Sequence, residues 1–226
     1  MPDLSFAIES AAAVPFCAVP TLAFTLRISN RPAGEVIHTV ALRCQIQIEA
    51  SRRRYGPEEH ARLADLFGDP DRWRDTVRTL LWTHVSVVVP AFTDAATVEL
   101  PVACTFDFNV ASTKYFHGIM EGDLPLCFQF SGTVFYANGG AALQVAPISW
   151  TQEARFRLPV ALWRDVIDAY YPNSAWLCLR RDVFDRLYRH KVRGGIPTWE
   201  QTLERVLTAA EAEPGRGVVE AGVVRP

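Results

Sequence analysis

The chain has 226 residues, of which 49% are hydrophobic and 21% are charged, and its formal net charge is −2. This composition is typical of one globular domain with or without a helical extension, and it excludes disordered, collagen-like and coiled-coil proteins. The near-neutral charge argues against a dedicated nucleic-acid-binding protein, and no apolar run reaches the roughly 18 residues that a membrane span needs.

The N-terminal segment carries Asp3 where a signal peptide would carry basic residues, and no long apolar stretch follows directly. The cysteines are widely spaced and form no CxxC pair, which argues against a zinc ribbon or a thioredoxin-type motif. We therefore expect a cytoplasmic protein with free thiols. The five cysteines are Cys17, Cys44, Cys104, Cys127 and Cys178.

Period-two alternation of apolar and polar residues dominates the first two thirds of the chain. It predicts strands with one buried face at about 21–29, 36–49, 83–89, 102–110, 124–136 and 142–158. The sequence Asn138-Gly139-Gly140 predicts a hairpin turn, and Pro147 predicts an edge or a bulge. Antiparallel pairing is expected throughout, because buried parallel strands seldom alternate in this way.

The apolar phase of these strands supplies the predicted core. Nearly complete burial is expected for Leu42, Cys44, Ile46, Phe106, Phe108, Phe128, Phe130 and Ile148. His38 lies on the same apolar phase, which predicts a hydrogen-bonded core histidine. Cys127 lies on the opposite phase to its apolar neighbours, so we expect it to be more accessible than the other strand cysteines.

Two segments have apolar residues at helical spacing instead. Residues 57–81 begin with Pro57, which suits a first helical position, and Gly68-Asp69-Pro70 divides the block into two helices. The C-terminal third contains three more helices, and Thr198 with Gln201 forms a capping box that opens the last of them.

This order of elements predicts an α+β fold that is mainly β. We expect an antiparallel β-sandwich (1–158) with a helical insertion at about 57–81. A C-terminal helical cap (159–211) is expected to pack on the sandwich, and a disordered tail (212–226) to follow it.

Sequence motifs for common chemistries are missing. The chain has no GxSxG elbow, no phosphate-binding GxxxxGK[ST] or GxGxxG loop, and no histidine pair at metal-ligand spacing. We therefore predict no catalytic residues, no cofactor and no metal site.

Two segments are candidates for binding. The connection 114–123 places Lys114, Tyr115, His117 and Asp123 between two predicted strands, where it is either a ligand or partner site or an ordered loop packed into the sandwich rim. Tyr171 and Trp176 lie at an aromatic junction between two predicted helices, which either packs the helical cap or anchors a partner.

Several longer stretches carry a resemblance to a known family. They are residues 66–73, Leu80-Leu81-Trp82-Thr83-His84, Lys114-Tyr115-Phe116, residues 130–136 and Tyr171-Pro172-Asn173. With these stretches the chain resembles an uncharacterised, chiefly actinobacterial family over residues 1–211. This resemblance implies that relatives are encoded beside genes for nickel–iron hydrogenases of the high-affinity type. The resemblance implies an accessory or assembly role and supplies no catalytic residues.

Two functional hypotheses follow. The first is a non-catalytic cytoplasmic accessory protein that binds another protein, such as a hydrogenase subunit or maturation factor. The alternative is a small-ligand-binding protein or enzyme that uses the loop 114–123. Convergence of Lys114, His117 and Asp123 in a deep pocket would favour the alternative, and a flat apolar patch would favour the first. The oligomeric state is left open.

Overall fold

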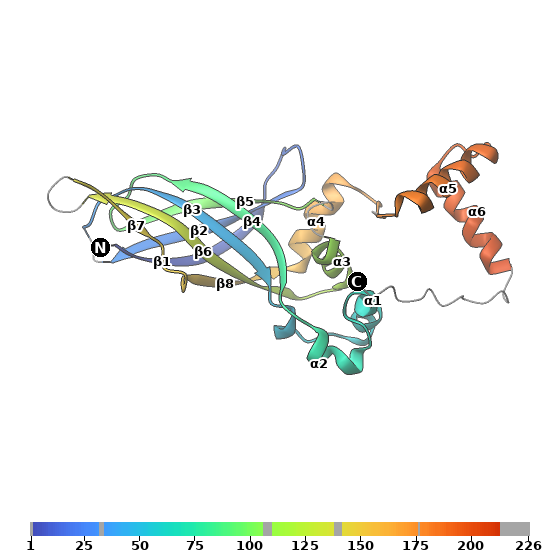
Figure 1. Cartoon of the computed structure of the whole chain (residues 1–226), viewed down its shortest axis with the longest axis horizontal. Helices are drawn as coiled ribbons and strands as arrows, with labels where there is room; N and C mark the ends of the chain where they lie inside the picture. The colour runs from blue at the N-terminus through green and yellow to red at the C-terminus, as the bar shows by residue number, and fades with distance from the viewer. Residues whose placement is uncertain (1, 32–33, 106–109, 138–141, 176, 213–226) are drawn as a thin grey trace. The chain divides into compact units, whose positions relative to one another are not determined.

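The fold is described from a computed structural model of the whole chain (Figure 1). The structure describes residues 2–31, 34–105, 110–137, 142–175 and 177–212. Two compact units are present, Met1–Ala175 and Trp176–Pro226, and each is considered by itself.

The described part of the first unit forms two antiparallel sheets. The smaller sheet has the strand order β1-β2-β5, in which β1 is Asp3–Ala13, β2 is Thr21–Arg31 and β5 is Ala95–Ala103. The larger sheet has the order β4-β3-β6-β7, and β8 pairs with the other end of β6. Its strands are β3 (Ile37–Ile48), β4 (Leu80–Val89), β6 (Asp123–Ala137), β7 (Leu143–Pro147) and β8 (Glu153–Pro159).

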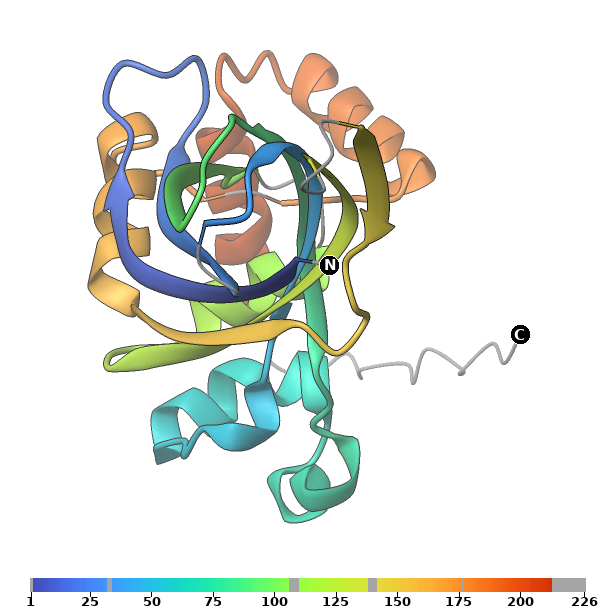
Figure 2. The same cartoon turned by 90° about the vertical axis from the view of Figure 1, so that its left-hand side faces the viewer.

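The two sheets curve around a common interior, as the view along the strands shows (Figure 2). Aromatic rings fill part of that interior: Phe24 of β2 lies 5.0 Å from Phe128 of β6, and Phe6 of β1 stacks 4.4 Å from Phe130. Gly132 allows β6 to lie close to β3, because a Cβ there would meet the carbonyl oxygen of Ala41 at 2.1 Å. The predicted α+β fold with an antiparallel sandwich is confirmed.

The predicted core is confirmed where the structure describes it. Leu42, Cys44, Ile46, Phe128, Phe130 and Ile148 are all buried. Phe106 and Phe108, which were predicted to join them, lie outside the described residues. Burial of these side chains supplies most of the driving force for folding, since each large apolar side chain contributes about 1.5–3 kcal/mol.

Several strand boundaries differ from the predicted ones. The strand predicted at 102–110 instead covers Ala95–Ala103, because the alternation of Val98, Leu100 and Val102 begins upstream. The run 142–158 is two strands separated by a turn, and β7 is an edge strand that ends at Pro147, as the proline indicates. Strand β1 was not predicted.

Four α-helices lie within the described residues of the first unit. They are α1 (Pro57–Phe67), α2 (Trp73–Thr76), α3 (Val110–Gly118) and α4 (Val160–Tyr170), with 3-10 turns η1 (Ala50–Arg52) and η2 (Pro70–Arg72) beside them. The inserted helical block is confirmed over α1 and α2, although its last residues already belong to β4. Helix α4 buries Trp163, Val166 and Ile167 in the core of this unit.

The second unit contains α5 (Arg181–Arg193) and α6 (Trp199–Ala212). The cap of α6 forms as expected, since the Gln201 backbone N–H donates to Thr198 Oγ1 at 3.2 Å. Residues 213–226 of the predicted tail lie outside the described residues. No helix among the described residues is long and apolar enough to cross a membrane.

Two predictions about single side chains are wrong. His38 is exposed, because a register shift between Ile37 and Thr39 turns it away from the core phase. Cys127 is only 4% exposed, because its thiol lies against Glu153 of the neighbouring strand β8 and donates to Oε2 at 3.6 Å.

Candidate functional site

The connection 114–123 was predicted as a loop, but its first half is helical. Helix α3 runs to Gly118, and the chain then turns into β6 at Asp123. The helix forms here because Tyr115, Phe116 and Ile119 follow helical spacing and are all buried. Packing of these apolar side chains against the sandwich therefore decides the local structure.

The three polar residues of this segment do not converge. Lys114 forms an ion pair with Asp65 of α1, and His117 lies edge-on to Trp163 of α4 with ring centroids 5.3 Å apart. Asp123 pairs with Arg157 of β8 at 3.4 Å. Each side chain is engaged with a different element, so they do not build a shared ligand site.

The aromatic candidates differ from one another. Tyr115 is fully buried, and its hydroxyl lies 2.9 Å from the hydroxyl of Tyr55, which donates to the Ala50 carbonyl oxygen at 2.6 Å. Burial raises the pKa of Tyr55 to about 12 and raises that of Tyr115 further. Tyr171 is half-buried and packs against the core of the first unit, and Trp176 lies outside the described residues.

A buried ion pair beneath α3 was not predicted. Arg53 follows η1, and its guanidinium makes two hydrogen bonds to the Glu59 carboxylate, at 2.7 and 2.9 Å. Only 9% of the Arg53 side chain and 7% of the Glu59 side chain are exposed. The sequence alone does not indicate this pair, because an acidic residue in the first turn of a helix, as Glu59 is, already has a local stabilising role there.

Backbone groups complete this buried pair. Glu59 also accepts from the N–H groups of Met120 and Gly56, at 2.9 and 3.1 Å, and Arg53 donates to the carbonyl oxygens of Glu121 and Asp123. Burial alone would raise the pKa of Glu59, but the hydrogen bonds from Arg53 and the two N–H groups lower it below its usual value. A fully satisfied pair of this kind fastens α1 to the turn between α3 and β6.

The outer face of the larger sheet carries a second unpredicted feature. Two rows of aligned residues cross it without a charged side chain. One row is Val145, Phe135 and Thr39, on β7, β6 and β3. The next is Pro147, Thr133, Ala41 and Val88, on β7, β6, β3 and β4. We call these seven residues the outer-face patch.

Four of the seven residues of the outer-face patch are exposed, and the other three are half-buried. Val88 is 75% exposed and Val145 is 59% exposed, and Leu143 beside them on β7 is 60% exposed. The strand that carries Leu143 and Val145 lies at the end of the sandwich away from α1, α3 and α4 (Figure 1). Exposed apolar residues that gather on an edge strand are unusual, because native proteins commonly protect such edges with charged side chains.

The other end of the same face is polar. Gln129 accepts hydrogen bonds from the side-chain amides of Gln47 and Gln45, at 3.1 and 3.4 Å, and Gln45 also lies 3.2 Å from His84. This end follows the ordinary alternation of an antiparallel sheet. The apolar character of the outer-face patch is therefore local. The sequence pattern that indicates such a patch is a run of apolar residues on both strand phases, as in Val134-Phe135 and Val87-Val88-Val89.

Neither a metal centre nor a converging polar pocket forms at the predicted segment. Within the described ranges, no three His, Cys, Asp or Glu side chains gather as metal ligands would. An open hollow lies at the end of α4, and its lining is Asp168, Pro172, Asn173, Ser174 and Ala175.

Burial makes the strand thiols poor nucleophiles. It raises the pKa of Cys44 and of Cys104 to about 12 and that of Cys127 to about 11, where Glu153 adds to the effect. We expect an aromatic disulfide reagent at about pH 8 to react with exposed Cys178 at once and with these three thiols only on unfolding. Mass spectrometry of the timed reaction checks this, and rapid native labelling of Cys44 or Cys104 would contradict it.

Comparison with known proteins gives a family and no activity. A family model described as "Family of unknown function (DUF6084)" matches residues 1–215. The chain belongs to this family. No curated protein matches it.

Solved structures share only weak likeness with the chain. A putative late embryogenesis abundant (LEA) protein is 10% identical, covers 70% of this chain and 72% of its own, and has a TM-score of 0.30. The putative ApaA protein from Bordetella pertussis is 15% identical, with coverages of 70% and 93% and a TM-score of 0.22. Beta-glucosidase 3B from Thermotoga neapolitana is 12% identical, with coverages of 69% and 17% and a TM-score of 0.25. Likeness at this level defines no function for the DUF6084 chain.

Proposed function

We propose that this DUF6084 protein is a non-catalytic cytoplasmic accessory protein that binds another protein through the outer-face patch. The observation that carries the proposal is the pair of uncharged rows, one across three strands and one across four, at one end of the larger sheet. Such a surface suits a partner that covers apolar groups, because burial of Val88 and Val145 on binding removes apolar area from water.

The chemistry of the patch favours a protein over other ligands. Its residues provide no cation for a phosphate backbone and no concave polar site for a small molecule. Among the described strands, β7 pairs only with β6, and an edge of this kind can accept a further strand. The family resemblance noted for the sequence suggests a nickel–iron hydrogenase subunit or maturation factor as the partner.

The alternative at residues 114–123 has less support. It needs Lys114, His117 and Asp123 to act on one ligand, and their contacts lead to three different elements. No observation in the described residues favours an enzyme at this position.

The test compares purified baits in extracts of the native cells. The wild-type chain and Gln47→Glu, which alters the polar end of the same face, are expected to retain the same partner in equal amounts. Val145→Glu is expected to retain at least about tenfold less, because a charge is then buried in the interface. Equal retention by all three baits would overturn the proposal. Circular dichroism checks that Val145→Glu is folded, as expected for a surface change.

A further inference from the structure

The second unit is a helical hairpin with almost no core of its own. Helices α5 and α6 have 13 and 14 residues, and isolated helices of that length are marginal in water. Among the described residues of this unit, α5 has no buried residue, and the buried ones are Ile196 in the turn and Thr202 on α6. Taken by itself, the hairpin therefore leaves apolar area that a further surface can cover.

An aromatic cluster at the closed end holds the hairpin together. Phe184 lies 5.4 Å from Trp199 between ring centroids, and Tyr188 lies 6.2 Å from the same ring. Lys191 sits over Trp199 at 5.7 Å and donates to the Pro197 carbonyl oxygen. These contacts fix the turn but leave apolar side chains exposed along both helices.

The uncovered residues form one apolar face on each helix. On α6, Leu203, Val206 and Leu207 follow Trp199 at helical spacing, and Leu207 is 60% exposed. On α5, Val192 continues the stripe of Phe184 and Tyr188 and is 59% exposed. Two hairpins with such faces can bury them together as a four-helix bundle.

The charges on the two helices favour a second copy of the chain as the partner that covers these apolar faces. Helix α5 carries five Arg and Lys side chains against two Asp, whereas α6 carries three Glu against one Arg. The glutamates Glu200, Glu204 and Glu211 share one side of α6, beside Leu203 and Leu207. Two positively charged side chains, Arg189 and Arg193, lie one turn apart on α5.

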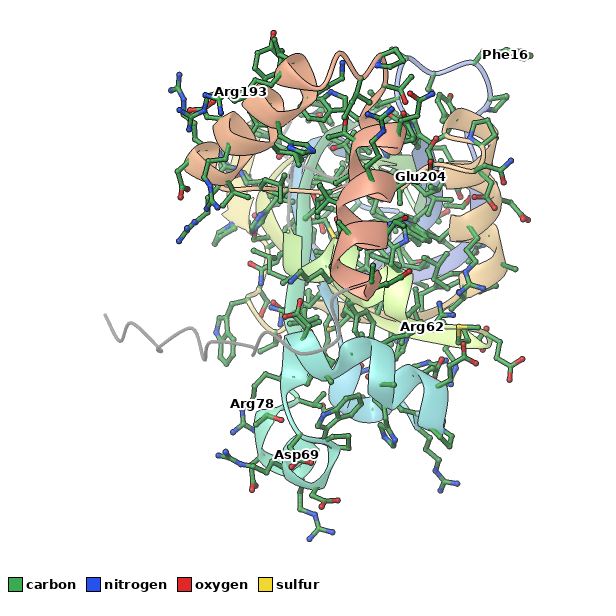
Figure 3. The ribbon with its side chains drawn as sticks, turned by 90° about the vertical axis from the view of Figure 1, so that its right-hand side faces the viewer. Phe16, Arg62, Asp69, Arg78, Arg193 and Glu204 are labelled. Carbon is green, nitrogen blue, oxygen red and sulfur yellow. The ribbon has the colours of Figure 1, made fainter. Side chains whose placement is uncertain are left out.

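Within the described part of the hairpin, these charges form no ion pair between its two helices. Among the described residues no ion pair joins α5 to α6, and the one ion pair of this unit links Arg180 to Asp182. Figure 3 labels Arg193 on α5 and Glu204 on α6, and neither has a partner of opposite charge in the described ion pairs. Helix α5 of one copy is thus complementary to α6 of another in both apolar area and charge.

We propose that the protein forms a two-fold homodimer in which α5 of each hairpin packs against α6 of the other copy. The interface is isologous, since the same two helices meet twice. It uses a surface of the second unit only and does not depend on the outer-face patch.

The full chain tests this by sedimentation velocity across a concentration series. The wild type and Val145→Glu are expected to dimerise equally, whereas Leu207→Glu raises the dissociation constant at least about tenfold. A monomeric wild type at all concentrations, or an unchanged Leu207→Glu dimer, would overturn the homodimer. Loss of the dimer in Val145→Glu would place the interface on the sheet instead and overturn it as well. Circular dichroism confirms folding of each variant.

A charge exchange tests the pairing of α5 with α6. One variant carries Arg189→Glu and Arg193→Glu, and the other carries Glu200→Arg and Glu204→Arg. Each alone is expected to be monomeric, because like charges then face each other across the interface, and a mixture of the two is expected to form a heterodimer. A mixture that stays monomeric overturns this pairing.

Discussion

Replacement of Glu59 by alanine is expected to lower the free energy of unfolding by about 3–5 kcal/mol, because it leaves the Arg53 guanidinium buried without its carboxylate. The same change removes an acceptor from the N–H groups of Met120 and Gly56. Urea unfolding followed by circular dichroism measures the loss. The anchor between α1 and the turn before β6 is then broken.

Glu58→Ala is the matched control. It removes the neighbouring carboxylate, whose pair with Arg62 is exposed on the helix surface, and should cost less than about 1 kcal/mol. Figure 3 shows Arg62 at the outside of α1. Equal costs for Glu58→Ala and Glu59→Ala would contradict the role of the buried pair.

The pH dependence of the Glu59 effect has a defined sign. Because the folded pKa of Glu59 is lowered, its contribution to stability is present above its unfolded pKa of about 4.5 and is lost as pH falls through the folded pKa. Unfolding free energies of wild type and Glu59→Gln should therefore converge in acid. A difference that stays constant from neutral pH to acid would contradict this.

The second large effect is expected in the core. Phe128→Ala should lower the free energy of unfolding by about 3–5 kcal/mol, through lost burial and the cavity left beside Phe24. Thermal or urea unfolding measures it. Phe16→Ala is the control with the same chemistry, because Phe16 is fully exposed (Figure 3), and its effect should stay within about 0.5 kcal/mol. A cost below about 1 kcal/mol for Phe128→Ala would mean that the inward strand phase is assigned wrongly.

The sequence predicted the long central strands well because their alternation is strong. In β3 and β6, Leu42, Cys44, Phe128 and Phe130 mark one buried phase, and this phase also sets the antiparallel register. Strand β1 was missed because alanine and serine dominate it and have little strand preference. Its pairing with β2 is decided by Leu4 and Phe6, which are buried between the sheets.

The candidate sites were harder to predict because they depend on tertiary contacts. Lys114 and His117 flank the buried residues Tyr115 and Phe116 in sequence. In the folded helix, the Lys114 side chain contacts α1 and the His117 side chain contacts α4. The outer-face patch needs the register of four strands before Val88 and Val145 can be placed on one surface. Neither the contacts of Lys114 and His117 nor the placement of Val88 beside Val145 can be derived from the spacing within one strand or one loop.

Site-specific photo-cross-linking in the native cells tests the central claim most directly. A photoreactive amino acid at position 145 samples the outer-face patch, and the same group at position 129 samples the polar end of that face. The proposed function predicts one discrete cross-linked product with a different protein from position 145 and none from position 129. Products from position 129 alone, or from neither position, would contradict it.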